Sequence, residues 1–312
     1  MSKPFRFANA SGTNAQIHRF DAKSPKGTII YVQGWNCRTG ELEGIAKTAR
    51  DNGYSGRTFE LPGFGKTQLQ ATSARHYFRE AAGIIAEMCY LDRIEKPIIV
   101  PHSMGGYVAS EFLRLVHETG KTGLMPRALY EITPGKADPL HTLPTDRLVF
   151  KATGWATRLL INTTQMTAAK AETAPTERNT RIRDLSLKTM LHAFDVLGPI
   201  MIRLIGGSKE AAAEFGNFTS ESLKVDPRIS AMQVLAMCQH APTLGGVGLP
   251  PHIRQIYGTH DIFIHGDSSI PLALSMYRGV DFSFAILPTG HFPHREAPEL
   301  VINDLLRFLE RV

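Results

Sequence analysis

"IIVPHSMGGYVASEF", residues 98–112, is the stretch that decides the fold. It opens with a run of β-branched residues that ends at Pro101, and after Ser103 and two glycines it continues with helical periodicity. A strand, a sharp turn and a helix that starts at once form a corner that can present a serine at the edge of a sheet. The alternative is that Ser103 only caps the helix, as serine often does.

The residues around this turn suit a tight corner. A strained turn needs small residues on both sides of the serine, because larger side chains would collide. Gly105 and Gly106 meet this need downstream, whereas Pro101 stands where glycine is usual upstream. Proline removes an N–H from an expected central strand, so we expect the ladder to end there. Its fixed φ suits extended backbone, and the assignment is kept.

Strands and helices alternate on both sides of this corner. This alternation predicts a mostly parallel sheet with helices on both faces, because parallel strands need crossovers and helices supply them. The expected strands are 4–10, 15–22, 27–34, 54–61, 96–100, 126–133, 252–258 and 281–287. The expected helices between them are 39–52, 72–92, 103–120, 268–278 and 297–312.

Residues 134–243 interrupt this alternation. No strand is expected there, and the helical segments are 146–172, 178–205, 208–216 and 227–240. We interpret this block as a helical lid inserted over the carboxyl edge of the sheet, where ligands bind in open α/β folds. The domains are then an α/β core, residues 1–133 and 244–312, and the lid, residues 134–243. The lid's apolar faces either accommodate an acyl chain or form the lid's own core.

Composition argues against several other classes of protein. The 312 residues are 43% hydrophobic and 21% charged, as in an ordinary globular protein. The formal net charge of +6 is spread without a run of like charges, so we expect no nucleic-acid partner. The longest apolar stretch, 196–207, is shorter than the roughly 20 residues that cross a bilayer, so we expect no transmembrane segment.

The cysteines and the N-terminal residues indicate in which cellular compartment the protein is expected. Cys37, Cys89 and Cys238 lie far apart and show no metal-ligand spacing, so we expect reduced thiols and no metal. No apolar run of signal-peptide length opens the chain. We therefore predict a cytoplasmic, soluble protein. The sequence gives no indication of the oligomeric state.

An aspartate and a histidine that could activate Ser103 follow it in the chain. A serine hydroxyl needs a base to become a nucleophile, and the base needs an orienting acid. In this type of fold the order is serine, then an acid after a late strand, then a histidine after the last strand. Asp261 and His291 occupy those two places. We therefore predict a catalytic triad of Ser103, Asp261 and His291.

Other assignments remain open at this point. Taken singly, Asp261 could form a loop turn and His291 could be a packing histidine. His260 and His294 are competing candidates for the base. Asp267 and Asp138 are fallback candidates for the acid.

An oxyanion in the transition state would need hydrogen-bond donors. The backbone N–H of Met104, which follows the nucleophile at the start of a helix, is the first predicted donor. The second is the backbone N–H of Trp35, after the strand that ends at Gly34. Trp35 and Phe64 are also candidate substrate contacts, with ordinary core packing as the alternative.

Five segments together resemble successive landmarks of the α/β-hydrolase superfamily. They are YVQGWN (31–36), ELPGFGKT (60–67), VPHSMGGYVA (100–109), YGTHD (257–261) and GHFPHREAPELV (290–301). HSMGG and residues 218–246 are similar to the lysophospholipase and monoacylglycerol-lipase branch. This resemblance implies an esterase that hydrolyses a carboxylic ester with a small or lipid-like acyl group, without a cofactor.

Two other functions remain open. The same triad could act on a thioester, amide, lactone or C–C bond, or transfer an acyl group, because a triad does not choose its leaving group. The chain could also be a non-catalytic binding protein on this scaffold, although the candidate triad is complete in the sequence.

Overall fold

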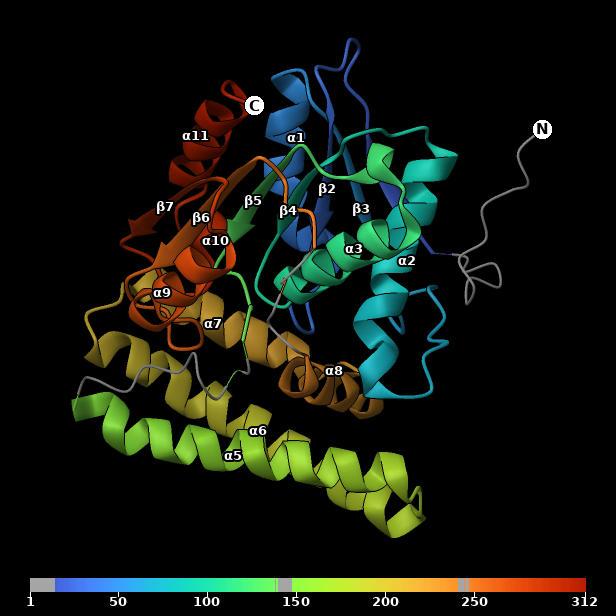
Figure 1. Cartoon of the computed structure of the whole chain (residues 1–312). Coiled ribbons are helices and arrows are strands. Elements are labelled where there is room, and N and C mark those ends of the chain that lie inside the picture. The colour runs from blue at the N-terminus through green and yellow to red at the C-terminus, as the bar shows by residue number, and fades with distance from the viewer. Residues whose placement is uncertain (1–14, 138, 140–147, 241–243, 245–246) are drawn as a thin grey trace.

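A seven-stranded sheet forms the centre of the part of the chain that the structure describes, residues 15–137, 139, 148–240, 244 and 247–312 of a computed structural model (Figure 1). The order is β1-β3-β2-β4-β5-β6-β7, with β1 antiparallel to β3 and all other pairs parallel. The strands are β1 (Ile17–Phe20), β2 (Thr28–Val32), β3 (Ser55–Phe59), β4 (Ile98–Pro101), β5 (Ala128–Ile132), β6 (His252–Gly258) and β7 (Asp281–Leu287). The strand predicted at 4–10 lies outside the described residues.

The central strands are apolar on both faces because helices cover both faces. Helices α1 (Glu43–Asp51) and α11 (Pro298–Leu309) pack on one face, where Ile45 and Leu305 join the core. Helices α2 (Tyr77–Leu91) and α3 (Gly105–Thr119) pack on the other face. The remaining core elements are α9 (Gly266–Met276), α10 (Pro293–Glu296) and the 3-10 turns η1 (Thr39–Leu42), η2 (Ala74–His76) and η3 (Thr122–Leu124). This is the predicted α/β-hydrolase fold.

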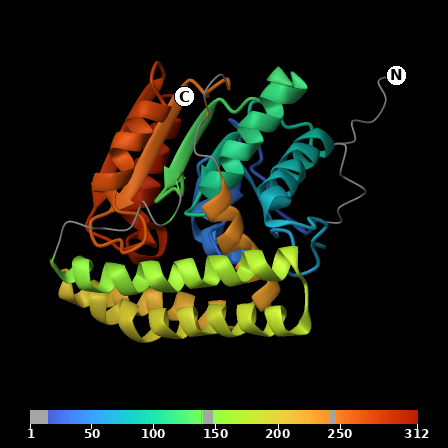
Figure 2. The same cartoon turned by 60° about the horizontal axis from the view of Figure 1, so that its bottom comes forward.

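Four helices form a separate layer across one edge of the sheet. They are α5 (Leu148–Thr173), α6 (Glu177–Leu204), α7 (Lys209–Ser222) and α8 (Pro227–Gln239), all within the stretch predicted as a lid. In Figures 1 and 2 the long helices α5 and α6 lie side by side as the layer farthest from the sheet. We use "lid" below for these four helices.

Helix α7 is longer than the sequence pattern predicts. The prediction ends it at Gly216, but the helix continues to Ser222. Phe218 and Ser222 are buried, so the packed face of the helix extends past the glycine. Tertiary packing here outweighs the weak helix propensity of glycine.

Helix α6 is the one helix of the described residues that is long and apolar enough to cross a membrane, by length and composition. It extends well beyond the apolar stretch 196–207 that the sequence analysis considered. Only 39% of its most apolar window is buried, and its buried side packs against α5, α7 and α8. Helix α6 is therefore part of the lid, with a large apolar surface left uncovered.

Candidate active site

The serine corner is built as the sequence pattern predicts. Ser103 has a φ of +49°, the left-handed conformation that a sharp strand-to-helix turn imposes. A Cβ added to Gly105 would lie 2.4 Å from the Val32 carbonyl oxygen, and one added to Gly106 would lie 2.7 Å from that of Gly135. Both positions therefore require glycine, and α3 can start directly after the turn.

Pro101 is the last residue of strand β4. Strand β4 still pairs Pro101 with Val32 of β2, and the next residue, His102, donates its N–H to the Val32 carbonyl at 2.8 Å. On the β5 side, pairing stops after Ile99 and resumes as a bridge at His102. Proline has no N–H to donate, so the gap falls where that donor is missing. The regular ladder therefore ends at Pro101, as expected, and His102 adds only an isolated bridge beyond it.

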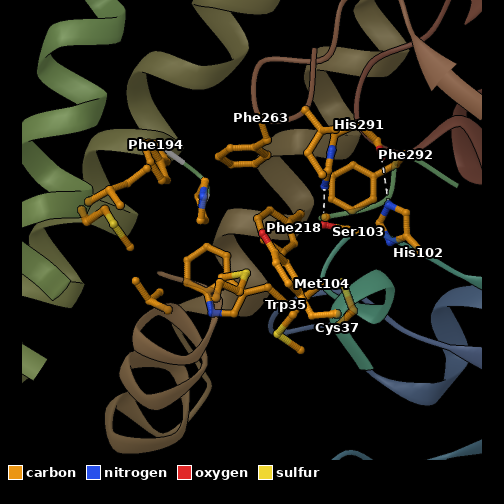
Figure 3. A pocket seen from close by; sticks show the side chains of 18 residues that line it. Trp35, Cys37, His102, Ser103, Met104, Phe194, Phe218, Phe263, His291 and Phe292 are labelled. Carbon is orange, nitrogen blue, oxygen red and sulfur yellow. Dashed lines mark hydrogen bonds between the residues drawn. The ribbon is translucent and has the colours of Figure 1, made fainter. Parts of the chain in front are cut away.

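Ser103, His291 and Asp261 lie in one hydrogen-bonded row (Figure 3 shows the serine and the histidine). The His291 Nε2 lies 2.8 Å from the Ser103 Oγ. The His291 Nδ1 lies 2.8 Å from an Asp261 carboxylate oxygen. The other Asp261 oxygen accepts the N–H groups of Phe263 and Ile264 at 2.7 and 2.9 Å. The fully buried carboxylate is thus fixed at both oxygens, and the imidazole between the two groups has a defined orientation.

The backbone on either side of His291 is fixed by another carboxylate. Glu296 accepts the N–H of Gly290 at 2.6 Å and that of Phe292 at 3.0 Å. Burial raises the pKa of Glu296, although these two donors oppose the shift. The His291 loop is therefore held independently of the bond to Asp261. Helix α10 supplies this carboxylate, which the sequence analysis did not identify.

The competing candidates do not lie on the serine. His294 is buried with its Nε2 3.6 Å from a Glu41 carboxylate oxygen. His260 does not line the cavity at Ser103, and its backbone N–H donates to the Thr289 carbonyl at 2.9 Å. Asp267 is largely exposed, with one carboxylate oxygen 3.6 Å from a His265 nitrogen. Asp138 lies outside the described residues. Among the described candidates, the structure brings together the three residues of the predicted triad.

Both predicted oxyanion donors line the cavity in front of Ser103. Trp35 and Met104 are buried residues of its wall. Within the described residues, neither backbone N–H donates to another protein group, so both remain free for a ligand oxygen. The side chain of Gln33 is used elsewhere, because its amide donates to the Phe59 carbonyl at 2.8 Å.

The loop that carries Trp35 is bonded to the last lid helix. The Trp35 indole N–H donates to the Ser230 carbonyl at 3.3 Å, and the Asn36 amide donates to the Ser230 hydroxyl at 2.8 Å. Gln233 accepts the Asn36 backbone N–H at 3.4 Å and donates to the Tyr77 hydroxyl at 2.6 Å. Helix α8 therefore helps to position an oxyanion donor, which sequence patterns did not indicate.

The cavity is apolar apart from the reacting groups. The lid contributes Ile161, Met190, Phe194, Phe218, Val234 and Met237 to its wall, and the core contributes Phe263 and Phe292 beside the serine and histidine (Figure 3). Phe64, a predicted substrate contact, does not line this cavity and is partly buried against the core. The lid's inward apolar residues thus form the wall of a binding site as well as the lid's own core.

Behind the serine lies a buried charged cluster formed by Glu41, His102 and His294. The His102 Nδ1 lies 2.7 Å from a Glu41 carboxylate oxygen, and the His102 Nε2 lies 2.9 Å from the His291 carbonyl oxygen. His102 thus lies between the Glu41 carboxylate and the backbone of the His291 loop. The second Glu41 oxygen accepts the Gly34 N–H at 3.0 Å.

The protonation states in this cluster follow from their neighbours. Burial would raise the pKa of Glu41, but the adjacent His102 and His294 outweigh burial and hold it well below its usual value. Burial lowers the pKa of His294 to about 4. Near neutral pH, Glu41 is therefore a carboxylate and His294 a neutral imidazole. It joins the Trp35 loop, the serine corner and the His291 loop.

The donor atoms of Cys37, Glu41 and His102 lie within 4.8 Å of one another, a spacing that can hold a metal ion. Two observations favour an ion pair instead. The 2.7 Å separation between Glu41 and His102 is that of a direct contact. Burial and the Glu41 charge raise the pKa of Cys37 well above its usual value, so its thiol is protonated, whereas metals bind the thiolate. We assign no metal to this cluster.

Comparisons with known proteins agree with this fold. A family model described as "Alpha/beta hydrolase family" matches residues 32–304. Comparison with curated proteins finds no match.

Several solved structures share the fold across nearly the whole chain. An esterase from Exiguobacterium antarcticum has a TM-score of 0.65 and 15% identity over 96% of both chains. A thermophilic esterase from Thermogutta terrifontis has a TM-score of 0.61 and 16% identity over 95% of this chain and 94% of that one. The enol-lactonase from Burkholderia xenovorans LB400 has a TM-score of 0.63 and 13% identity over 96% and 98%. At these identities the likeness shows the fold alone.

Proposed function

Because the chain belongs to the alpha/beta hydrolase family, we propose that it is a serine hydrolase that cleaves a carboxylic ester with a lipid-like acyl group. The observation that carries the proposal is the hydrogen-bonded row of Ser103, His291 and Asp261 at the base of an apolar cavity. The serine supplies a nucleophile, the imidazole a base, and the carboxylate an orienting acid. The cavity supplies apolar surface for an acyl chain.

The first half of the reaction forms an acyl-enzyme. The Ser103 Oγ attacks the ester carbonyl carbon while the His291 Nε2 takes its proton. The backbone N–H groups of Trp35 and Met104 stabilise the oxyanion of the tetrahedral intermediate. His291 then donates the proton to the leaving alcohol as the C–O bond breaks. Asp261 holds the Nδ1–H tautomer and stabilises the imidazolium throughout.

The second half hydrolyses the acyl-enzyme. His291 takes a proton from a water molecule, which attacks the acyl carbon, and the carboxylic acid leaves as Ser103 regains its proton. The lid surrounds the acyl chain with Phe194, Phe218 and Met190. A water-poor, apolar wall strengthens the hydrogen bonds to the oxyanion.

Three further considerations support an ester of lipid-like character. The first is the number of lid residues with apolar side chains that line the cavity, because each acyl CH₂ that they bury contributes about 0.8 kcal/mol. The second is the resemblance of HSMGG and residues 218–246 to the lysophospholipase and monoacylglycerol-lipase branch. The third is that two of the solved structures with this fold carry the name esterase.

The experiment is a series of p-nitrophenyl esters from acetate to palmitate, followed by monoacylglycerols, assayed with the purified chain and with Ser103→Ala. We expect hydrolysis, with kcat/KM rising with acyl length before it declines. Ser103→Ala should lose about 10⁶-fold in kcat while its circular dichroism spectrum is unchanged. A mutant of undiminished rate, or a folded wild-type chain that cleaves none of these esters, would contradict the proposal.

A further inference from the structure

Helix α6 is apolar on two opposite sides. Its inward side is buried in the lid and includes Met190 and Phe194, which line the cavity. Its outward side carries large apolar side chains that are exposed: Ile182, Leu185, Val196, Leu197, Ile200 and Leu204. An amphipathic surface helix would place polar residues there. We call this outward row the α6 stripe. It exposes large apolar side chains where a surface helix normally carries polar ones.

The α6 stripe has two parts on one side of the helix, Ile182 and Leu185 near its start and residues 196–204 near its end. At 3.6 residues per turn, Ile182, Leu185, Val196 and Ile200 project within about 60° of one another. Leu185 is 66% exposed and Val196 is 63% exposed, so neither is covered by a neighbouring element. In Figures 1 and 2, α6 belongs to the layer of the molecule farthest from the sheet. A flat surface could therefore contact the whole stripe at once.

Basic side chains lie on the same helix as the α6 stripe. Arg178, Arg181 and Lys188 are exposed on α6, and none of them takes part in an ion pair within the described residues. The helical geometry places Arg181 and Lys188 along one flank of the stripe. The only exposed acid among the described residues of α6 is Glu177, at its first position. The surface is thus apolar with a positive margin.

The charge distribution favours an anionic lipid surface over a second copy of the chain. A two-fold interface would place the stripe of one copy on the stripe of the other, which brings like charges together. Anionic headgroups would instead pair with the arginines and the lysine, while the apolar side chains enter the acyl boundary. An exposed apolar helix face with a basic margin is the composition of a helix that lies in a membrane interface.

We propose that the outward face of α6 docks the protein on an anionic membrane surface, with the helix lying parallel to the bilayer. Docking would place the lid against the lipid, with the cavity directly behind α6, because Met190 and Phe194 project from its other side. The helix lies on the surface and does not span it, since its inward side is packed against α5, α7 and α8. The proposal does not depend on which bond the active site cleaves.

Vesicle binding by an inactive variant tests this proposal separately from ester hydrolysis. The full chain with Ser103→Ala is sedimented with sucrose-loaded vesicles of phosphatidylcholine, with or without about one third phosphatidylglycerol. We expect binding to the anionic vesicles that weakens in high salt. Leu185→Gln/Val196→Gln/Ile200→Gln should reduce partitioning at least about 10-fold. Arg181→Gln/Lys188→Gln should reduce it about 30-fold on anionic vesicles only.

A matched control separates the stripe from general surface hydrophobicity. Leu91, at the end of α2, is 61% exposed and lies outside the lid, so Leu91→Gln should leave vesicle binding unchanged. The same substitutions in the active chain should leave hydrolysis of a soluble acetate ester intact, which shows that the fold is retained.

Two results would overturn the proposal. The first is a wild-type chain that does not bind anionic vesicles, or binds them as well after the stripe substitutions. The second is a dimer in sedimentation that the stripe substitutions convert to a monomer, without vesicle binding, which would assign the face to a second copy of this chain.

Discussion

The two walls of the cavity differ in how they are built. On the core wall, each reacting group is fixed by named hydrogen bonds: Asp261 at both oxygens, His291 at both ring nitrogens, and the Ser103 backbone by its bond to the Ile132 carbonyl. On the lid wall, Met190, Phe194 and the other contacts are apolar side chains held by packing. Under the proposed function, the chemistry then depends on hydrogen bonds and the choice of substrate on apolar packing.

This difference teaches where substitutions should act. A hydrogen-bonded group on the core wall acts in the transition state, so its loss should lower kcat for every substrate. A packing residue on the lid wall contacts the acyl chain, so its loss should change the ranking of substrates. Four substitutions test this division, taken in order of expected effect.

The largest of these effects tests the core wall at Asp261. Asp261→Asn keeps the shape of the side chain but favours the wrong tautomer of His291. We expect kcat to fall about 10⁴-fold for short and long esters alike. The measurement is steady-state kinetics on the ester series, with Asp267→Asn, at an exposed carboxylate in the first turn of α9, as the control. An effect confined to long acyl chains would contradict the division.

The second effect tests the buried cluster behind the serine. Glu41→Gln removes the charge that faces His102 and weakens the link between the Trp35 loop and the serine corner. Misplacement of the reacting groups should lower kcat about 100-fold with little change in KM. Glu41→Asp should restore part of the rate. Glu43 lies two residues away with a half-exposed side chain, and Glu43→Gln should have no effect on kcat.

If Glu41→Gln alters only the melting temperature and leaves kcat intact in the folded protein, Glu41 is a structural residue alone. Loss of half a buried ion pair typically destabilises a protein by roughly 3–5 kcal/mol, so kinetics are measured well below the melting temperature.

The core wall could be predicted from the sequence because its signals are local. Strand, turn and helix around Ser103 follow from residues 98–112, and Asp261 and His291 follow from their places after late strands. The structure describes strands and helices close to the predicted ranges, and it brings those three side chains together. Their catalytic roles stay a proposal until the experiments above are done.

The features that escaped prediction depend on contacts between distant segments. Glu41 stands in a short polar turn, and no periodicity marks it as buried against His102, 61 positions away in the chain. Phe64 is a candidate substrate contact in the sequence, but in the structure it packs against the core and does not line the cavity. The apolar faces of α6 were visible in the sequence, whereas which face is covered depends on how α5, α7 and α8 pack.

The third effect tests the lid wall. Phe194→Ala removes an aromatic contact from the cavity, and we expect kcat/KM for long-chain esters to fall about 10-fold while that for the acetate ester changes little. The control is Val196→Ala, since Val196 projects from the opposite side of the same helix. A uniform loss across the ester series would show that this lid residue supports the reacting groups instead.

His294→Gln should have the smallest effect on activity. It should instead change how the free energy of unfolding depends on pH. The pKa of His294 falls from an ordinary 6.5 to about 4 on burial, so the unfolded chain binds more protons between these values. Stability should be full above pH 6.5 and should decline by about 3 kcal/mol as the pH drops to about 4. His294→Gln should flatten this decline, whereas His76→Gln, at an exposed histidine, should not.

Urea denaturation of the wild type and both variants across this pH range measures the effect. Parallel curves for the wild type and His294→Gln would contradict the neutral state assigned to His294.

The proposed mechanism requires the hydroxyl of Ser103 to be the activated nucleophile. Labelling with a fluorophosphonate, followed by peptide mapping, identifies that nucleophile by its position. We expect a single phosphonylated serine at position 103, with labelling suppressed in His291→Asn and slowed in Asp261→Asn. A label on another serine, or an ester-hydrolysing protein that takes no label at Ser103, would contradict it.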